Sequence, residues 1–479
     1  MTKQEAVIKY IEDNYLQFNR LRHDIVSDKL QIRMESDLTT LPHTTQPLHH
    51  PTPCYWREMT KQDINSIVCH CAQEYDQNIT SREVMTALQS DLIPDVHPLR
   101  EYILSLKPYT PDQPDWIDMV ASQVRIKSAP ESATDRPKGL SERTACCQTT
   151  TLLDRPYGAD RPMNLTGEAD LTVSEANGLV SNSSQSERSK ASRLWRACFK
   201  KWFVAMVASW MRDEVVNHQV LVLIGKQGIF KTTWLEHLIP PHLRAYACKL
   251  ANSNELNKDE RLRIAEFGLI SLDEIDSMNN RELNQLKSVI TATDVNERAA
   301  YAYTKERRVR LASFCASGNR RDFLTDITGN RRWLPFEVES IQNPFHTQLP
   351  YEQMYAEAWA LANDEFFSYW FDLDEIEVLE QHNQHFRDES NEEQLLDVYF
   401  AVPAREATNT KFLTTAEISE RLIYYGNIKR PLSLSRLGVL LSQKGFLSIR
   451  KGSPQRRGWI VYERDNEEVN AERRILSKT

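Results

Sequence analysis

The sequence has no apolar run approaching the roughly 20 residues that a membrane-spanning helix needs. Its first residues, MTKQEAVIKYIEDNY, also lack the continuous apolar core of a signal peptide. Eight cysteines are spread over 479 residues and none stands in a CxxC pair, so a disulfide framework is not expected. These absences predict a soluble cytoplasmic protein with reduced cysteines and no membrane partner.

An excess of positive charge is missing as well. The net charge of -8 and the pI near 5.9 argue against a uniformly basic nucleic-acid binder, so any such contact must come from local patches. Cys69, His70 and Cys71 lack the usual ligand spacing of a zinc site. The alternative is a partly buried helix on which Cys69 and Cys71 point in different directions. No primase-type catalytic cluster is apparent, so primer synthesis would belong to a separate partner.

Periodicity and composition divide the chain into five segments. The spacing of Ile8, Ile11 and Tyr15 predicts helices near the N-terminus, and Ser81 is expected to cap another helix. A stretch rich in Ser, Thr, Pro, Asp and Gly follows, and it has too little apolar surface to offset the entropy of ordering. The predicted segments are a helical domain (1–127), a disordered insertion (128–190), an α/β core (191–345), a helical extension (346–400) and a C-terminal domain with a charged tail (401–479).

A phosphate-binding turn is predicted directly after the apolar run VLVLI. The following residues, GKQGIFKTT, supply Gly225 and Gly228 for the turn, Lys231 for phosphate oxygens and Thr232 for magnesium. Glycine is usual just before the lysine, but Phe230 stands there. An ordinary glycine-containing strand-to-helix turn is the alternative. The predicted contacts to ATP are Gly225, Gly228, Ile229, Phe230, Lys231, Thr232 and Thr233.

Two further apolar runs end in polar residues that suit the same chemistry. The run FGLISL ends in Asp273 and Glu274, where Asp273 is expected to hold Mg²⁺ and Glu274 to orient the attacking water. The run LASFCA leads to Asn319, which is expected to hydrogen-bond the same water. Carboxyl ends of parallel strands meet at one edge of a sheet. Solvated strand ends remain the alternative for each.

Adjacent arginines are candidates for stabilising the charge that develops on a transferred phosphoryl group. Arg331 and Arg332 follow a predicted turn, and Arg320 and Arg321 are second candidates. Such arginines are often delivered by a neighbouring subunit. A solvated or ion-paired cluster is the other interpretation.

Together, GKQGIFKTTW, LISLDEID, FCASGN and DITGNRRWLPFEV resemble the virulence-associated protein E family, whose members look like superfamily III helicases. The resemblance covers roughly residues 194–338 and implies an α/β P-loop ATPase core of the AAA+ or superfamily III type. It assigns Lys231 and Thr232 to Walker A, Asp273 and Glu274 to Walker B, Asn319 to the sensor, and Arg331 and Arg332 to the finger. It also implies a ring of identical subunits.

The resemblance further implies a DNA-contacting hairpin between Glu274 and Asn319. Tyr301, Tyr303 and Lys305 fall in this interval. Aromatic rings stack on the bases of single-stranded DNA while cations contact its phosphates. We therefore expect these three residues to contact DNA.

The C-terminal segment predicts a winged-helix-like domain. Two helices begin near Thr414 and Ser433, and a hairpin follows with a basic tip. Such a patch favours the DNA backbone, and protein contacts are the alternative use. The basic residues expected to contact DNA are Arg450, Lys451, Arg456 and Arg457.

These observations favour an ATP-hydrolysing enzyme that uses Mg²⁺ and moves on or unwinds single-stranded or forked DNA in mobile-element replication. The alternative class is an ATP-binding switch or DNA-binding scaffold without motor activity. A role in phage–host conflict is also compatible with the sequence.

Overall fold

The computed structural model describes residues 1–34, 55–127, 181–251, 258–297, 306–324, 330–387, 391–403, 409–426, 433–451 and 455–476. The chain divides into two compact units. Unit 1 holds Met1–Arg321 and Arg331–Leu379, and unit 2 holds Asp322–Asn330 and Glu380–Thr479. Within the described ranges, no helix is both long enough and apolar enough to cross a membrane.

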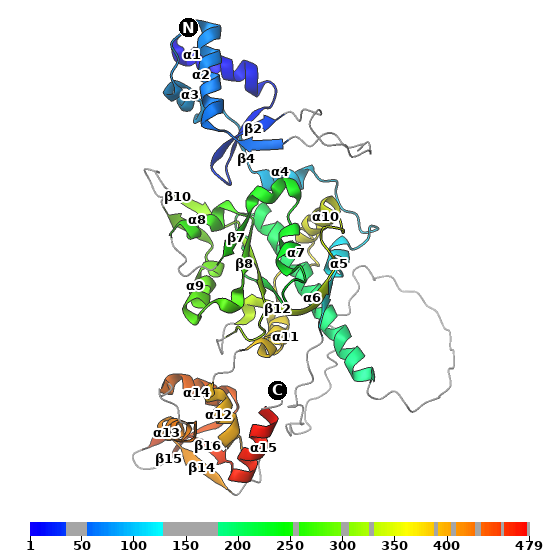
Figure 1. The fold of residues 1–479 in the computed structure, drawn as a ribbon, viewed down its shortest axis with the longest axis vertical. Helices are drawn as coiled ribbons and strands as arrows, with labels where there is room; N and C mark the ends of the chain where they lie inside the picture. Colours follow the sequence, from blue (N-terminus) through cyan, green and yellow to red (C-terminus); the bar gives the residue numbers. More distant parts are fainter. Residues whose placement is uncertain are drawn as a thin grey trace, which may run out of the picture. The chain divides into compact units, whose positions relative to one another are not determined.

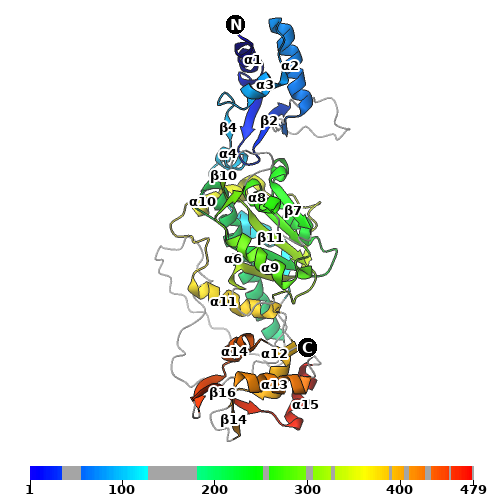
Figure 2. The same cartoon turned by 90° about the vertical axis from the view of Figure 1, so that its left-hand side faces the viewer.

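The N-terminal part of unit 1 combines helices with a small sheet, although helices alone were expected. The helices are α1 (Lys3–Ile11), which continues as a π-helical turn (Glu12–Leu16), α2 (Lys61–Tyr75) and α3 (Ser81–Leu88). They lie together beside the sheet in Figures 1 and 2. The sheet has the order β3-β2-β1-β4, made by β1 (Leu21–Asp24), β2 (Lys29–Met34), β3 (Tyr55–Glu58) and β4 (Asp95–Val96). Strands this short give almost no period-2 pattern in the sequence.

Threonines begin the three N-terminal helices. Thr2, Thr60 and Thr80 each accept a backbone hydrogen bond from the residue three positions later, whose carboxylate bonds back to the threonine. This reciprocal pair satisfies two backbone donors that a helix start leaves open. Ser81, which was expected to be the cap, is instead the first helical residue of α3.

The aromatic stripe predicted as core is buried on α6 (Ser181–Met211). Trp195, Phe199, Trp202 and Trp210 on this helix are almost fully buried. The helix begins inside the segment that was expected to be disordered, so residues 181–190 are helical, while residues 128–180 lie outside the described ranges. The same core includes residues of α4 (Pro98–Ser105), α5 (Trp116–Ala121) and β5 (Val124–Ile126).

A six-stranded sheet forms the centre of unit 1, in the order β5-β12-β6-β11-β8-β7. Its strands after β5 are β6 (Val220–Ile224), β7 (Ala247–Ala251), β8 (Leu269–Asp273), β11 (Ser313–Gly318) and β12 (Trp333–Ile341). These five are parallel to their neighbours, and β5 joins β12 antiparallel at the edge. The chain is therefore a mixed α/β protein with a parallel sheet.

Helices and loops bury both faces of this sheet. Leu221 and Leu223 of β6 belong to the core cluster that contains α6 and α10, whereas Val220 and Val222 are buried outside that cluster. Alternate residues of a strand face opposite sides. The remaining elements before unit 2 are α7 (Lys231–His237), α8 (Lys258–Glu266), α9 (Asn280–Thr291), β9 (Asp294–Glu297), β10 (Glu306–Val309), α10 (Tyr351–Ala362) and α11 (Leu373–Asn383), with 3-10 turns at Pro241–Tyr246, Ile275–Ser277 and Asn330–Arg332.

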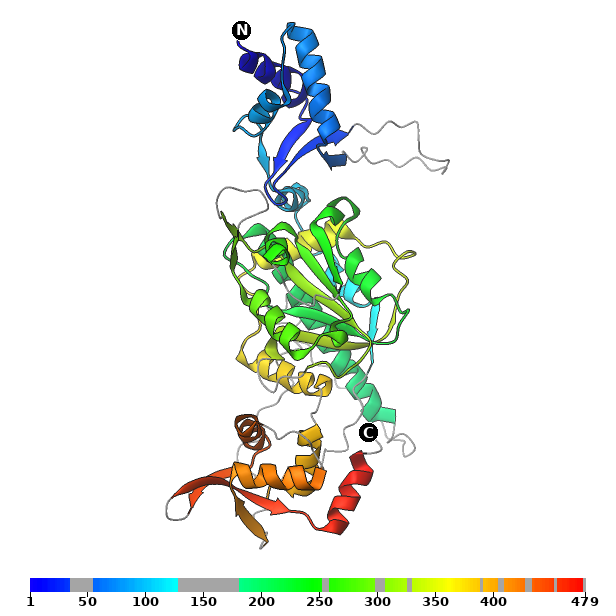
Figure 3. The ribbon, with the colours of Figure 1, turned by 60° about the vertical axis from the view of Figure 1, so that its left-hand side comes forward.

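Unit 2 has its own apolar core, which contains Leu396, Leu422 and Leu437. After a 3-10 turn (Gln384–Phe386), its elements are α12 (Asn391–Tyr399), β13 (Phe400–Ala401), β14 (Thr410–Leu413), α13 (Thr415–Gly426), α14 (Leu434–Gln443), β15 (Leu447–Lys451), β16 (Arg456–Glu463) and α15 (Asn466–Leu476). Strand β16 pairs antiparallel with β13, β14 and β15. The β15–β16 hairpin projects past α13 in Figure 3. The unit begins before residue 401, where the C-terminal domain was expected to start.

Candidate active site

The glycine-containing turn joins the central strand β6 to α7, as the sequence predicts. A Cβ atom on Gly225 would lie 2.8 Å from the carbonyl oxygen of Val338 in β12. The amide of Gly225 donates to the carbonyl of Gly318 in β11 at 3.1 Å. The turn is thus held between two neighbouring strands and leaves no room for a side chain at Gly225.

Lys231 is the first residue of α7, and it is 7% exposed. Its Nζ donates to the carbonyls of Gly225 at 2.8 Å and Lys226 at 2.7 Å, and to Oδ1 of Asn319 at 3.3 Å. Burial lowers the pKa of this ammonium group. The side chain therefore folds back over the turn, beside the backbone amides at the N-terminus of α7. The partial positive charge of a helix N-terminus favours a bound anion.

Thr232, Asp273 and Ser317 form a hydrogen-bonded cluster beside Lys231. The Ser317 hydroxyl donates to Oδ1 of Asp273 at 2.8 Å and lies 2.8 Å from the Thr232 hydroxyl. The Thr232 hydroxyl donates to the same carboxylate oxygen at 3.3 Å. The structure thus brings together two predicted residues from α7 and β8. It adds Ser317 of β11, to which the sequence had given no role.

Lys249 is a second residue that sequence reasoning missed. Its Nζ lies 2.6 Å from Oδ2 of Asp273, since β7 is parallel to β8 and pairs with it. Burial opposes ionisation of Asp273, but hydrogen bonds from Lys249, Ser317 and Thr232 outweigh it and lower the pKa of this carboxyl. The hydrogen bond to Asp273 also raises the pKa of Lys249. Asp273 is therefore held as a carboxylate.

Glu274 and Asn319 follow their strands and are exposed at the same edge of the sheet. Glu274 has a φ of 51°, a left-handed conformation that is uncommon for a residue other than glycine. The backbone amides of Asn319 and Arg320 donate to the two carboxylate oxygens of Asp276 at 3.2 and 3.1 Å. Asp276, which the sequence did not single out, therefore fixes the loop that carries Asn319.

Arg331 and Arg332 lie at the end of the parallel strands opposite the end that carries Lys231. They precede β12, whose Trp333 pairs with Val220 at the start of β6. The paired stretch of these two strands spans about 13 Å. Arg331 is exposed, and burial lowers the pKa of Arg332. The structure therefore does not bring this pair to the β6–α7 turn of its own chain, whereas Arg320 and Arg321 follow Asn319 directly.

The predicted DNA hairpin is described only at its base. Strands β9 and β10 pair antiparallel, with Glu297 opposite Glu306. Tyr301, Tyr303 and Lys305 lie outside the described residues.

The predicted basic residues of unit 2 face one another across the β15–β16 ladder. Arg450 is opposite Arg457, and Lys451 is opposite Arg456. All four residues are exposed. Like charges directly opposite each other destabilise a ladder, so this arrangement costs stability unless an anion compensates it.

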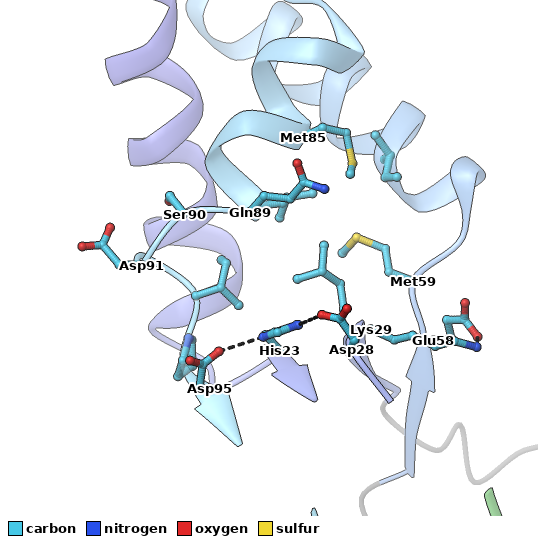
Figure 4. Close-up of a pocket in the computed structure, with 15 residues that line it drawn as sticks. His23, Asp28, Lys29, Glu58, Met59, Met85, Gln89, Ser90, Asp91 and Asp95 are labelled. Carbon is cyan, nitrogen blue, oxygen red and sulfur yellow. Dashed lines mark hydrogen bonds and ion pairs between the residues drawn. The ribbon is translucent and has the colours of Figure 1, made fainter. Parts of the chain in front are cut away.

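A separate hollow is lined by other residues. It is a pocket of about 820 Å³ in the N-terminal part of unit 1. At its floor, Nδ1 of His23 lies 2.7 Å from Asp95 and Nε2 lies 3.2 Å from Asp28 (Figure 4). None of the predicted site residues lines this pocket. The candidate active site therefore rests on convergent side chains at the sheet edge and not on the size of a cavity.

Residues 177–388 match the family model described as the virulence-associated protein E-like domain. This match confirms the resemblance inferred from the motifs. The chain is also similar to the C-terminal region of NrS-1 in its apo form. One such structure has a TM-score of 0.41 and 9% identity, and the match covers 94% of this chain and 98% of that one. Another has a TM-score of 0.39 and 11% identity, with 96% and 100% covered. Among curated proteins, none matches this chain.

Proposed function

We propose that this chain, in which residues 177–388 form a virulence-associated protein E-like domain, is an ATP-hydrolysing DNA helicase or translocase of mobile-element replication. The nucleotide binds at the β6–α7 turn of unit 1. DNA contacts the β15–β16 hairpin of unit 2 and the segment between β9 and β10. The fold class that goes with this proposal is a P-loop core with a winged-helix-like domain.

The observation that carries the proposal is the convergence of five side chains at three strand ends. Lys231 bonds to Asn319, and Thr232 and Ser317 bond to Asp273. A buried lysine at a helix N-terminus favours phosphate, and it is surrounded by hydroxyl, amide and carboxylate groups. A turn with a purely structural role would not need Asn319, Thr232, Ser317 and Asp273 around the lysine.

The donor set fits magnesium as well as phosphate. Thr232 and Asp273 offer a hydroxyl and a carboxylate within hydrogen-bonding distance of each other, and Mg²⁺ prefers hard oxygen ligands. The ion would supply charge neutralisation for the phosphates. Lys249 already places a positive charge on the other oxygen of Asp273. In our proposal, Asp273 and Thr232 hold Mg²⁺ and Glu274 orients the attacking water.

We also propose a ring of identical subunits, because the finger candidates are distant from the candidate site of their own chain. Arg331 and Arg332 precede β12, at the end of the parallel strands opposite Lys231, and in our proposal they serve the site of another subunit. A cation delivered between subunits stabilises the charge of phosphoryl transfer. We propose such a homo-oligomer, with any primase as a separate protein.

The element order of unit 2 supports DNA binding. Helix α12, strand β14, helices α13 and α14, and the β15–β16 hairpin follow one another as in a winged helix. Two pairs of cations face each other across the hairpin and repel each other. DNA phosphates bound at the hairpin would neutralise this repulsion.

Steady-state ATP hydrolysis with and without single-stranded DNA tests the proposal. We expect DNA to stimulate turnover and Lys231→Ala to lower it by about 100-fold or more, as loss of a transition-state contact does. Lys107→Ala, which removes an exposed lysine outside the site, is the matched control. If the wild-type protein did not hydrolyse ATP, or if wild type and Lys231→Ala had equal turnover, the proposal that this site hydrolyses ATP would be refuted.

An ATP-binding switch or scaffold is the second candidate, and Phe230 favours it. This residue has a φ of 67° where glycine is usual, so the turn carries a conformation that costs roughly 1–2 kcal/mol for a side-chain-bearing residue. In this second candidate, the chain binds ATP at the strained turn but hydrolyses it slowly or not at all. ATP binding without DNA-stimulated hydrolysis would favour this candidate over the motor, including a use in phage–host conflict.

A further inference from the structure

An exposed phenylalanine lies beside the phosphate turn. Phe345 is 69% exposed, although aromatic side chains of this size are usually buried. It belongs to the loop between β12 and α10, and β12 is parallel to β6. The loop therefore emerges at the same sheet edge as the β6–α7 turn.

The ring of Phe345 contacts both ends of α7. Its centroid lies 6.4 Å from that of Phe230, with an interplanar angle of 80°. It lies 5.5 Å from the ring of His237, with an angle of 87°. Despite these two contacts, most of the Phe345 side chain stays open to solvent.

These contacts place Phe345 along one face of α7. Phe230, Thr233 and His237 are spaced three and four residues apart, so they share a face of the helix. Nδ1 of His237 lies 2.7 Å from the carbonyl oxygen of Thr233. Lys231 and His237 are separated by about 9 Å along the helix axis. Phe230 directly precedes Lys231, so the Phe345 ring lies beside the turn at which we propose that the nucleotide phosphates bind.

The loop that carries Phe345 is held in place by hydrogen bonds. The backbone amide of Phe345 donates to Oδ1 of Asn343 at 3.0 Å. The amides of His346 and Thr347 donate to the carbonyl of Asn343 at 3.1 and 3.2 Å. The Tyr351 hydroxyl donates to the carbonyl of His237 at 2.7 Å, which ties the start of α10 to the end of α7. The exposed ring is therefore preorganised.

We propose that Phe345 is the platform on which the base of the bound nucleotide stacks, with a preference for the larger face of a purine. This inference rests on the proposed nucleotide site and adds to it the subsite that recognises the base. Phosphate contacts alone cannot distinguish ATP from CTP, whereas stacking strength depends on the area of the base.

Equilibrium binding of ATP, CTP and inorganic tripolyphosphate, each with Mg²⁺, tests the proposal on the full chain. We expect Phe345→Ala to weaken ATP binding by roughly five- to 100-fold, as loss of one stacking partner does. Tripolyphosphate binding should be unchanged, and the preference for ATP over CTP should narrow. Phe345→Trp should restore ATP binding because it keeps an aromatic face. Phe366→Ala removes a 94% exposed ring elsewhere in unit 1 and is the matched control.

The outcomes separate this inference from the proposed function. Wild-type affinity for ATP in Phe345→Ala would overturn the stacking platform while leaving the phosphate site in place. Equal losses for ATP and tripolyphosphate would also overturn it, because the substitution would then act on the turn. A wild-type protein that binds neither ligand would overturn the proposed function and the platform with it.

Discussion

Arg310 is a buried cation that joins three segments of unit 1. It is 1% exposed and follows β10 directly. Its guanidinium donates to the carbonyls of Ala312 at 3.0 Å, Asn217 at 2.9 Å, Ala292 at 3.3 Å and Val289 at 3.5 Å, and also to that of Ile290. These bonds connect the start of β11, the approach to β6 and the end of α9.

We predict that Arg310→Met lowers the free energy of unfolding of unit 1 by up to about 3 kcal/mol. The three closest of these carbonyls lose a donor in a buried site, at about 1 kcal/mol net for each hydrogen bond. Methionine retains most of the apolar packing of the stem. Removal of the buried charge offsets part of the loss, since burial lowers the pKa of Arg310 to about 9 and thus disfavours the charged form.

Urea unfolding followed by tryptophan fluorescence measures this loss, because Trp202, Trp210 and Trp333 are buried in unit 1. Arg307→Met is the matched control. Arg307 lies three residues earlier, its side chain is 76% exposed and it pairs with Asp294. An exposed pair contributes at most about 1 kcal/mol. If Arg310→Met were no less stable than Arg307→Met, the carbonyl bonds of Arg310 would not anchor these segments.

Three further predictions concern the site, the hairpin and the N-terminal part. Glu274→Gln should retain ATP binding but lose hydrolysis, and turnover equal to wild type would exclude its role with water. Replacing Arg456 and Arg457 by Glu should weaken DNA binding and make the plot of log affinity against log salt concentration less steep by about 1.4 to 1.8. An unchanged slope would contradict a contact between these arginines and DNA phosphates. The hydrogen bond from Arg57 lowers the pKa of Asp63, so Asp63→Asn should cost about 1–3 kcal/mol of unfolding free energy at pH 7. This difference in unfolding free energy should shrink as the pH falls below about 4. The reason is that the Asp63 carboxylate becomes protonated in the unfolded chain first, and in the folded chain only at lower pH. If urea unfolding gave the same difference at every pH, the ion pair with Arg57 would not stabilise the fold.

The turn between β6 and α7 could be predicted because its residues are contiguous. An apolar strand, two glycines, a lysine and a threonine stand within one short segment, so their order alone places Lys231 at a helix start. Asp273 and Asn319 could be placed at strand ends for the same reason. Lys249, Ser317 and Asp276 escaped prediction because their roles depend on which strands are neighbours. Nothing in the order of residues states that β7 pairs with β8 or that β11 lies between β6 and β8.

The sequence by itself determined the local elements of the core and the chemistry that each offers. Buried strands, the helix start at Lys231 and the basic hairpin follow from hydrophobic patterns and turn residues over a few positions. Only the tertiary structure decided which side chains meet. It placed Lys249 on Asp273, set Arg331 and Arg332 at the far edge, and brought Phe345 to α7. The physical reason is that strand pairing and packing act between segments far apart in the chain, whereas sequence patterns record interactions over a few residues.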